Sequence, residues 1–87
     1  MKYKVQLKRS VIKTLKSIPQ KEIKKIGKKI DSLEQNPVPK DSKKIKGEKD
    51  LYRVRVGNYR ILYFFQNSDL IVLVIRVDHR KDIYKDI

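Results

Sequence analysis

Arginines gather in the middle of the 87-residue chain, around a short turn, and they could bind a phosphate. Arg53 and Arg55 precede the pair Gly57-Asn58, and Arg60 follows it. The guanidinium group is planar and can hold two phosphate oxygens at once, so a cluster of arginines is typical of an anion-binding site. Asp and Glu are too few in the neighbouring sequence to neutralise the three arginines, and we therefore expect them to bind an anion.

Three more candidate residues lie in the segment HRKDIY, residues 79–84. His79 is the only side chain of a type that exchanges protons readily near neutral pH. Arg80 adds a cation, and Tyr84 adds an aromatic ring on which a nucleobase could stack, although a tyrosine near a terminus is more often a packing residue. Because the chain has no Cys and only one His, we expect neither a metal ion nor a cofactor.

The charge of the whole chain favours a polyanionic partner. Lys and Arg together number 23 against 10 Asp and Glu, which gives a formal net charge of +13. Such a field attracts nucleic acid first and an acidic protein second. Some of the lysines reflect composition, since the chain has no Ala and favours Lys and Ile, but this does not explain a cluster of arginines.

The spacing around the arginines predicts a β-hairpin. Apolar and charged residues alternate over residues 52–56. A second run, rich in apolar and aromatic residues, follows over residues 59–66, and Gly57-Asn58 is a two-residue turn between the two runs. This register places Arg55 directly opposite Arg60, where two cations repel each other unless an anion lies between them. Val54, Val56 and other apolar residues occupy the opposite face of the hairpin. We expect helices to cover that apolar face and to leave the arginine face free.

The remaining elements are predicted from periodicity and from helix-ending residues. A strand is predicted at residues 3–7, followed by a helix with Ser10 as its N-cap and an apolar face of Val11, Ile12, Leu15 and Ile18. A second helix is opened by Pro19 and ended by Asn36-Pro37, and its apolar face consists of Ile23, Ile26, Ile30 and Leu33. A short strand near residues 43–47, an apolar strand over residues 70–77 and a short C-terminal helix complete the list.

This order predicts a single α+β domain over residues 1–87. Two layers are expected, with the N-terminal strand and a helical hairpin packed on an antiparallel sheet. The apolar strand suits a central position that is covered on both faces. The amino terminus lacks the apolar region of a signal peptide, and the longest apolar run is too short to span a bilayer. We expect a soluble, cytoplasmic protein.

The segments KIKGEKDLYRVRVGNYRILY and VIRVDHRKDIY resemble the RelE/ParE superfamily of toxins from bacterial and archaeal toxin–antitoxin systems. The resemblance extends over the length and element order of the whole chain. It implies a fold like that of microbial ribonucleases. RelE-type members are ribosome-dependent endoribonucleases that cleave messenger RNA in the decoding site, so the resemblance implies this activity for the chain.

The resemblance also implies roles for individual residues. The 2′-hydroxyl of the RNA attacks the adjacent phosphate and leaves a cyclic phosphate and a free 5′-hydroxyl. Arg60 would clamp the scissile phosphate, Arg80 would serve the leaving oxygen, and Tyr84 would orient the base. The RNA- and phosphate-binding residues would be Arg53, Arg55, Lys44 and Lys46.

One departure from the family pattern concerns the general base. The best-known member has lysines at the two positions before the turn, whereas this chain has Arg53 and Arg55, and arginine stays protonated and makes a poor base. Our hypothesis is that His79, or a group supplied by the ribosome, takes the proton.

Two other functions stay open: a ParE-like inhibitor of DNA gyrase that performs no hydrolysis, and a catalytically silent RNA-binding domain. The expected partners are an acidic, RelB-like antitoxin, the ribosome and messenger RNA, with no membrane.

Overall fold

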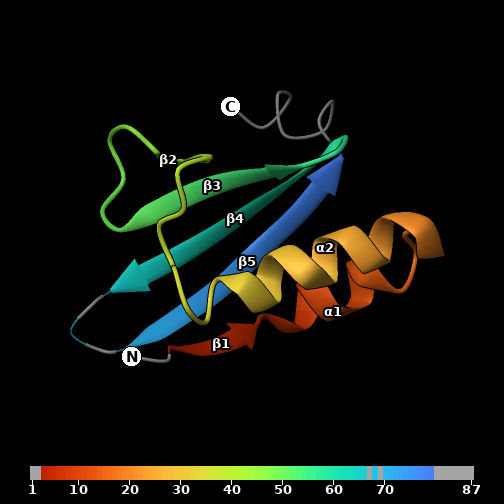
Figure 1. Ribbon diagram of the computed structural model, residues 1–87, viewed down its shortest axis with the longest axis horizontal. Helices are drawn as coiled ribbons and strands as arrows, with labels where there is room; N and C mark the ends of the chain where they lie inside the picture. Colours follow the sequence, from red (N-terminus) through yellow and green to blue (C-terminus); the bar gives the residue numbers. More distant parts are fainter. Residues whose placement is uncertain (1–2, 67, 69, 80–87) are drawn as a thin grey trace.

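The computed structural model describes residues 3–66, 68 and 70–79, which form a five-stranded sheet and two helices (Figure 1). The elements follow one another as β1 (Lys4–Leu7), α1 (Arg9–Leu15), α2 (Gln20–Ser32), β2 (Ser42–Lys44), β3 (Leu51–Val56), β4 (Tyr59–Gln66) and β5 (Ile71–His79). Across the sheet the strand order is β1-β5-β4-β3-β2. The predicted α+β fold and order of elements are confirmed.

The hairpin of β3 and β4 has the predicted register. Val56 pairs with Tyr59, and Arg55 pairs with Arg60. Gly57 has a φ of +57°, whereas Asn58 does not have a positive φ, which is the arrangement of a type II′ turn. A turn of this type twists in the same sense as the strands on either side of it, so it holds β3 and β4 in this register.

The pairing of β1 was not predicted in detail. β1 lies parallel to β5 rather than antiparallel, with Val5 opposite Val72 and Leu7 opposite Val74. Both helices lie between β1 and the rest of the sheet in sequence, so the chain is free to return in the parallel direction. β5 itself begins at Ile71 and ends at His79, two residues beyond the predicted end.

A bulge in β5 adjusts which residues face the core. Leu62 of β4 pairs with Arg76, but the next residue, Tyr63, pairs with Val74, so Ile75 is the extra residue of the bulge. As a result Val74 and Val77, which are three residues apart, are both buried.

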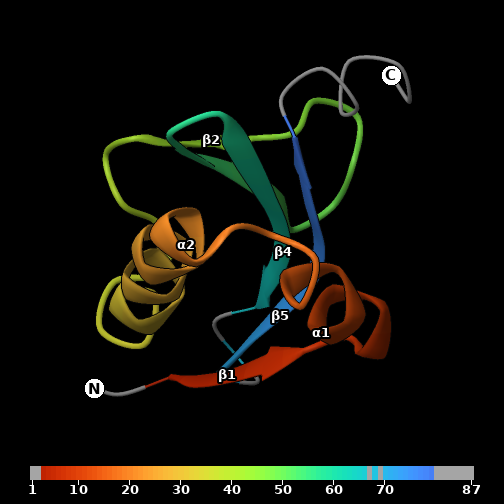
Figure 2. The ribbon, with the colours of Figure 1, turned by 90° about the vertical axis from the view of Figure 1, so that its right-hand side faces the viewer.

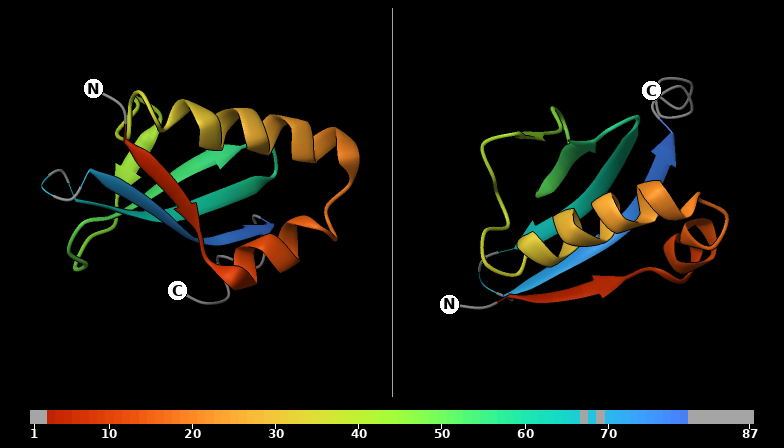
Figure 3. Two further views of the ribbon diagram at one scale, coloured as in Figure 1. Left: turned by 90° about the horizontal axis from the view of Figure 1, so that it is seen from below. Right: turned by 45° about the vertical axis from the view of Figure 1, so that its right-hand side comes forward.

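The hydrophobic core lies between α2 and one face of the sheet, which we call the core face. From the helices the core takes Val11, Ile26, Ile30 and Leu33, and from the sheet it takes Val54, Val56, Ile61, Tyr63, Val72, Val74 and Val77. Figure 3 shows α2 running along the sheet, and Figure 2 shows α1 beside β5 beyond the end of β1. The predicted apolar face of α2 is confirmed, since Ile26, Ile30 and Leu33 are buried and Ile23 is half-buried.

The prediction for α1 was partly wrong. Ser10 lies inside the helix, because the N-cap residue is Lys8, whose carbonyl already accepts the backbone N–H of Val11 and of Ile12. Val11 is buried, but Ile12 is 45% exposed, because this seven-residue helix presents only one narrow side to β5. The strand at β1 continues almost directly into the helix and leaves no room for a separate cap.

The boundaries of α2 also differ from the prediction. Pro19 is the N-cap rather than the first helical residue, and the helix ends at Ser32, before Asn36-Pro37. The predicted C-terminal helix lies outside the described residues. Within the part of the chain that the structure describes, no helix is long and apolar enough to cross a membrane.

Tyr63 provides a test of how the loop after α2 is held. Its side chain is completely buried, and its Oη donates a hydrogen bond of 2.7 Å to the carbonyl of Pro37. Burial raises the pKa of Tyr63 to about 12, so the folded protein favours the protonated phenol. The stabilisation is therefore complete below pH 10, the ordinary pKa of tyrosine, and is lost as the pH rises toward 12.

We predict that Tyr63→Phe lowers the free energy of unfolding by about 1 to 2 kcal/mol, because the buried Pro37 carbonyl loses its donor. Urea denaturation at pH 7.5 measures this loss. Between pH 7.5 and pH 10.5, the free energy of unfolding should fall less for Tyr63→Phe than for the unaltered protein. Tyr52→Phe is the control, because Tyr52 stacks on Tyr63 but is only half-buried. Equal losses in the two variants would contradict the assigned role of the Tyr63 hydroxyl.

Candidate phosphate-binding face

The sheet face opposite the core face carries most of the candidate residues, and we call it the outer face. Because side chains alternate along a strand, the residues next to the buried ones in sequence point to this side. The outer face therefore holds Lys43 of β2, Arg53 and Arg55 of β3, Arg60, Leu62 and Phe64 of β4, and Leu73, Arg76 and Asp78 of β5. The predicted grouping of Arg53, Arg55 and Arg60 on one face, away from the helices, is confirmed.

Arg53 and Arg55 line a hollow of about 300 Å³ together with Lys43 and Asp41. Arg55 is exposed and Arg53 is half-buried. Within the described residues neither arginine has an ion-pair partner. Among the described residues, two guanidinium groups and an ammonium group thus share a concave surface with a single carboxylate, and this charge balance suits an anion from solution.

Arg60 differs from the other two arginines in its burial. It lies between Arg55 and Asp78 on the neighbouring strands and is only 1% exposed. The helices leave this face free, as predicted, but the side chain of Arg60 is nevertheless buried. Its place on β4 is not by itself the reason, because Leu62 and Phe64 lie on the same face of this strand and are more exposed. Direct contact between Arg60 and a phosphate requires that its guanidinium become accessible.

Arg76 is a functional candidate that sequence reasoning missed. It lies on the outer face opposite Leu62, and its Nε donates to Oδ2 of Asp78. Arg76 directly follows the apolar run of residues 70–75. This change from apolar to charged residues within one strand was the sequence signal that could have identified Arg76 as a candidate. Asp78 lies next to both Arg60 and Arg76 and offsets part of the positive charge at the β5 side of the face.

The lysines predicted to bind RNA are placed less favourably than one that was not chosen. Lys44 pairs with Tyr52, and alternation places both residues on the core face of the sheet. Lys46 is an exposed residue after β2. Lys43 pairs with Arg53 and lines the hollow. The register of the short strand β2 decides this difference, and periodicity could not supply it.

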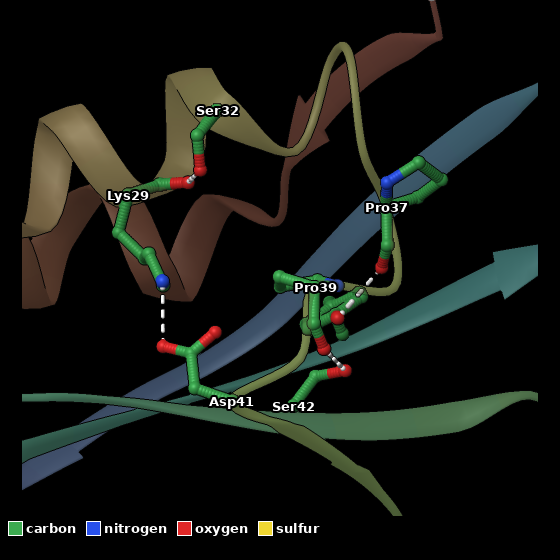
Figure 4. A network of polar contacts seen from close by, with 7 residues as sticks. Lys29, Ser32, Pro37, Pro39, Asp41 and Ser42 are labelled. Atoms are coloured by element: carbon green, nitrogen blue, oxygen red, sulfur yellow. Dashed lines mark hydrogen bonds and ion pairs between the residues drawn. The ribbon is translucent and has the colours of Figure 1, made fainter.

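Asp41 connects the hollow to α2. Its Oδ2 accepts a contact of 2.6 Å from Nζ of Lys29, and Figure 4 shows this pair reaching from the helix to the loop before β2. The hydrogen bond from Lys29 holds the pKa of Asp41 below its ordinary value. Asp41 is therefore ionised at neutral pH and places one negative charge at the rim of the hollow.

His79 is not brought together with the arginines. It pairs with Tyr59 at the end of β5, and the two rings meet edge to face with centroids 5.4 Å apart. Alternation places Tyr59 and His79 on the core side of the sheet, whereas Arg55 and Arg60 belong to the outer face. Arg80 and Tyr84, the other predicted catalytic residues, lie outside the described residues.

The described part of the site can bind and orient a phosphate diester but offers little for proton transfer. Arg53, Arg55 and Lys43 supply positive charge and hydrogen-bond donors. Such donors stabilise the negative charge that develops on a phosphate when a neighbouring hydroxyl attacks it. Any acceleration from these residues comes from position and electrostatics rather than from a strong base.

The arrangement of the strands and helices is the RelE-like α+β fold. The RelE–RelB complex of the archaeon Pyrococcus horikoshii OT3 contains a chain that superposes with a TM-score of 0.83 and 33% sequence identity. The match covers 92% of this chain and 97% of that chain. The predicted fold and resemblance are therefore confirmed by a protein of known structure.

Sequence comparison identifies the family. Residues 5–84 match the ParE toxin family of the type II toxin–antitoxin system parDE, and the chain belongs to this family. Two relatives come from Methanocaldococcus jannaschii. Toxin RelE3 is 44% identical over 85 residues, covering 93% of this chain and 94% of the relative. RelE1 is 36% identical over 89 residues, covering 99% of both. The chain is thus a RelE-like toxin of a type II toxin–antitoxin system.

We predict that Asp41→Asn strengthens the binding of polyanions several-fold at low salt, because it removes a carboxylate that lines the hollow. Fluorescence anisotropy with a labelled single-stranded oligonucleotide measures the affinity. Asp31→Asn makes the same change of net charge on the exposed side of α2 and serves as the control. If both variants gain equally, overall charge rather than the hollow determines the binding.

The same variant should be less stable than the unaltered protein at neutral pH, and this difference should shrink in acid. The lowered pKa of Asp41 means that its ion pair with Lys29 stabilises the fold above the ordinary carboxylate pKa of 3.8 and is lost as the pH falls through the lower, folded value. Because half of the Asp41 side chain is exposed and water screens the pair, we expect the loss to stay below about 1 kcal/mol.

Proposed function

We propose that this toxin is a ribosome-dependent endoribonuclease that cleaves messenger RNA and thereby inhibits translation. The observation that carries the proposal is the hollow of Lys43, Arg53 and Arg55, whose two arginines have no ion-pair partner within the described residues. The net charge of +13 and the likeness to RelE toxins support the same substrate class.

The proposed reaction is a transfer within the RNA strand. The 2′-hydroxyl oxygen attacks the adjacent phosphorus, the bond to the 5′-oxygen breaks, and the products are a 2′,3′-cyclic phosphate and a 5′-hydroxyl. One proton leaves the attacking hydroxyl and one reaches the leaving oxygen. Arg53 and Arg55 bind the phosphate and Lys43 adds charge. Lys44 and Lys46, which do not line the hollow, would contact the RNA outside it.

Residues that sequence reasoning placed at the reacting phosphate keep their proposed roles with one revision. Arg60 clamps the scissile phosphate once its guanidinium is accessible, Arg80 serves the leaving oxygen, and Tyr84 orients the base. His79 is the revised residue, because its place on the core side beside Tyr59 does not support proton abstraction at the outer face. We therefore favour a group of the ribosome as the general base.

We predict that replacing both Arg53 and Arg55 by Ala lowers the rate of cleavage at least about 100-fold, because the phosphate loses its main charge partners. Primer extension on a translated message, beside an untranslated one, maps and quantifies the cuts. Lys24→Ala together with Lys25→Ala removes the same charge from the exposed side of α2 and should leave the rate unchanged. His79→Ala should also cleave normally.

The contradicting results of this experiment point to different functions. Cuts that persist without translation would mean a ribosome-independent nuclease. If the unaltered protein makes no cuts at all, a supercoiling assay with DNA gyrase comes next. The match of residues 5–84 to the ParE toxin family makes gyrase inhibition the second candidate.

We also propose an acidic, RelB-like antitoxin as the protein partner. The likeness to the RelE chain of the Pyrococcus complex supports a partner of this kind, and the net charge of +13 favours an acidic one. Its carboxylates would compete with RNA for Arg53 and Arg55, and the association rate would then fall as salt screens the charges.

We predict that a RelB-like antitoxin displaces labelled RNA from the toxin, and that Arg53→Ala with Arg55→Ala slows antitoxin association while largely preserving the complex. Stopped-flow mixing at increasing salt measures the rate. An association rate that is unaffected by salt and by these substitutions would contradict electrostatic competition at the outer face.

A further inference from the structure

The outer face is divided into two chemically different halves. Following the pairing across β3, β4 and β5, one row contains Arg55, Arg60 and Asp78, and the next contains Arg53, Leu62 and Arg76. We call these two rows the cationic half. The following row contains Leu51, Phe64 and Leu73 and continues to Gln6 of β1, and the last contains Gln66 and Ile71 and continues to Lys4 at the edge of the sheet. We call these two rows the apolar half.

The apolar half contains a hollow of its own. It has a volume of about 330 Å³ and is lined by Gln6, Phe64, Gln66, Ile71 and Leu73. None of these side chains is charged, although the protein as a whole is strongly basic. The volume lies at the lower end of the range of about 300 to 1,000 Å³ that is typical of small-molecule sites.

The side chains of this hollow suit an aromatic ring with a polar edge. Phe64 is 37% exposed, which leaves ring surface available for stacking. Gln6 and Gln66 lie at opposite ends of the lining, on β1 and β4, and a glutamine amide can both donate and accept hydrogen bonds. Gln66 is already oriented, because its Nε2 donates to Oδ2 of Asp50 at 3.2 Å.

The distance between the halves matches the parts of one nucleotide. Outer-face residues that follow one another along a strand are about 7 Å apart, so Phe64 lies one row from Leu62 and from its neighbours Arg53 and Arg76. A nucleotide whose phosphate contacts the cationic half can therefore extend its base over Phe64. Cationic grooves with aromatic stacking platforms are the usual design of single-strand binding sites.

We propose that the hollow of the apolar half holds one nucleobase of a bound single-stranded RNA. The base stacks on Phe64, the amides of Gln6 and Gln66 contact its edge, and the phosphates of the same strand lie on the cationic half. This inference rests on the proposed action on RNA and adds a second contact point, about 13 Å along β4 from Arg60, to that function. Charge complementarity between the phosphates and the cationic half favours RNA over an apolar protein segment as the occupant.

The test uses the full-length protein and short 2′-O-methyl oligoribonucleotides, which lack the attacking hydroxyl and cannot be cleaved. A series of oligonucleotides, each with one abasic position, is titrated by fluorescence anisotropy. If one base occupies the hollow, its removal should weaken binding at least about fivefold, and this effect should appear at a single position of the series. Because this scan uses the unaltered protein, it remains decisive if a variant fails to fold.

Substitution then links that position to Phe64. Phe64→Ala should weaken binding of the intact strand to the same degree and should abolish the penalty for the missing base, whereas Phe64→Tyr should preserve both. Ile12→Ala removes an exposed apolar side chain from α1, 45% exposed against 37% for Phe64, and is the control. The salt dependence should be unchanged in Phe64→Ala and should fall by about one unit of slope in Arg53→Ala.

Three outcomes would overturn the inference, and they are distinguishable. Salt-dependent binding without any sensitive position, or with a penalty that persists in Phe64→Ala, would remove the base site and leave the proposed function intact. Loss of antitoxin binding in Phe64→Ala with unchanged RNA binding would make the apolar half a protein contact. Binding without salt dependence would overturn the phosphate-binding face as well.

Discussion

The register of β3 against β4 is the constraint on which the rest of the structure depends. Because side chains alternate, a shift of one residue would move Val54 and Ile61 out of the core and the arginines into it. The type II′ turn at Gly57-Asn58 sets Val56 opposite Tyr59, and the packing of α2 on the apolar side makes any other register costly. The same pairing that builds the core thus gathers positive charge on the outer face.

That concentration of charge opposes folding and is tolerated because the core face compensates for it. Arg55 directly faces Arg60, and such like-charged pairs across a ladder are destabilising. Asp78 relieves part of the repulsion beside Arg60 and Arg76, whereas Arg53 and Arg55 have no carboxylate partner within the described residues. A bound phosphate chain would reduce the repulsion among these arginines. The energetics of the fold are therefore connected to the proposed function of the toxin. The uncharged lining of the neighbouring hollow suits a base in the same way that the cationic surface suits a phosphate.

Sequence reasoning succeeded where the signal was local. The bounds of β3 and β4, the turn between them and the apolar face of α2 follow from alternation, from Gly57 and from helical spacing. It was less successful where contacts over long sequence distances decide the outcome. The parallel pairing of β1, the bulge at Ile75 and the start of α1 at Arg9 depend on how β5 and β1 meet. Within the site, the choice between Lys43 and Lys44 depended on the register of a three-residue strand.

The sequence by itself determined the class of the fold, the family and the gathering of Arg53, Arg55 and Arg60 on one face. These properties depend on periodicity and residue type, which a single chain displays directly. Only the tertiary structure decided that Arg60 is buried, that His79 belongs to the opposite side of the sheet, and that Phe64 adjoins an uncharged hollow. The physical reason is that burial and proximity depend on which strands become neighbours in the sheet. The pairing of β5 with both β4 and β1 cannot be recognised from the residues of any one of these strands.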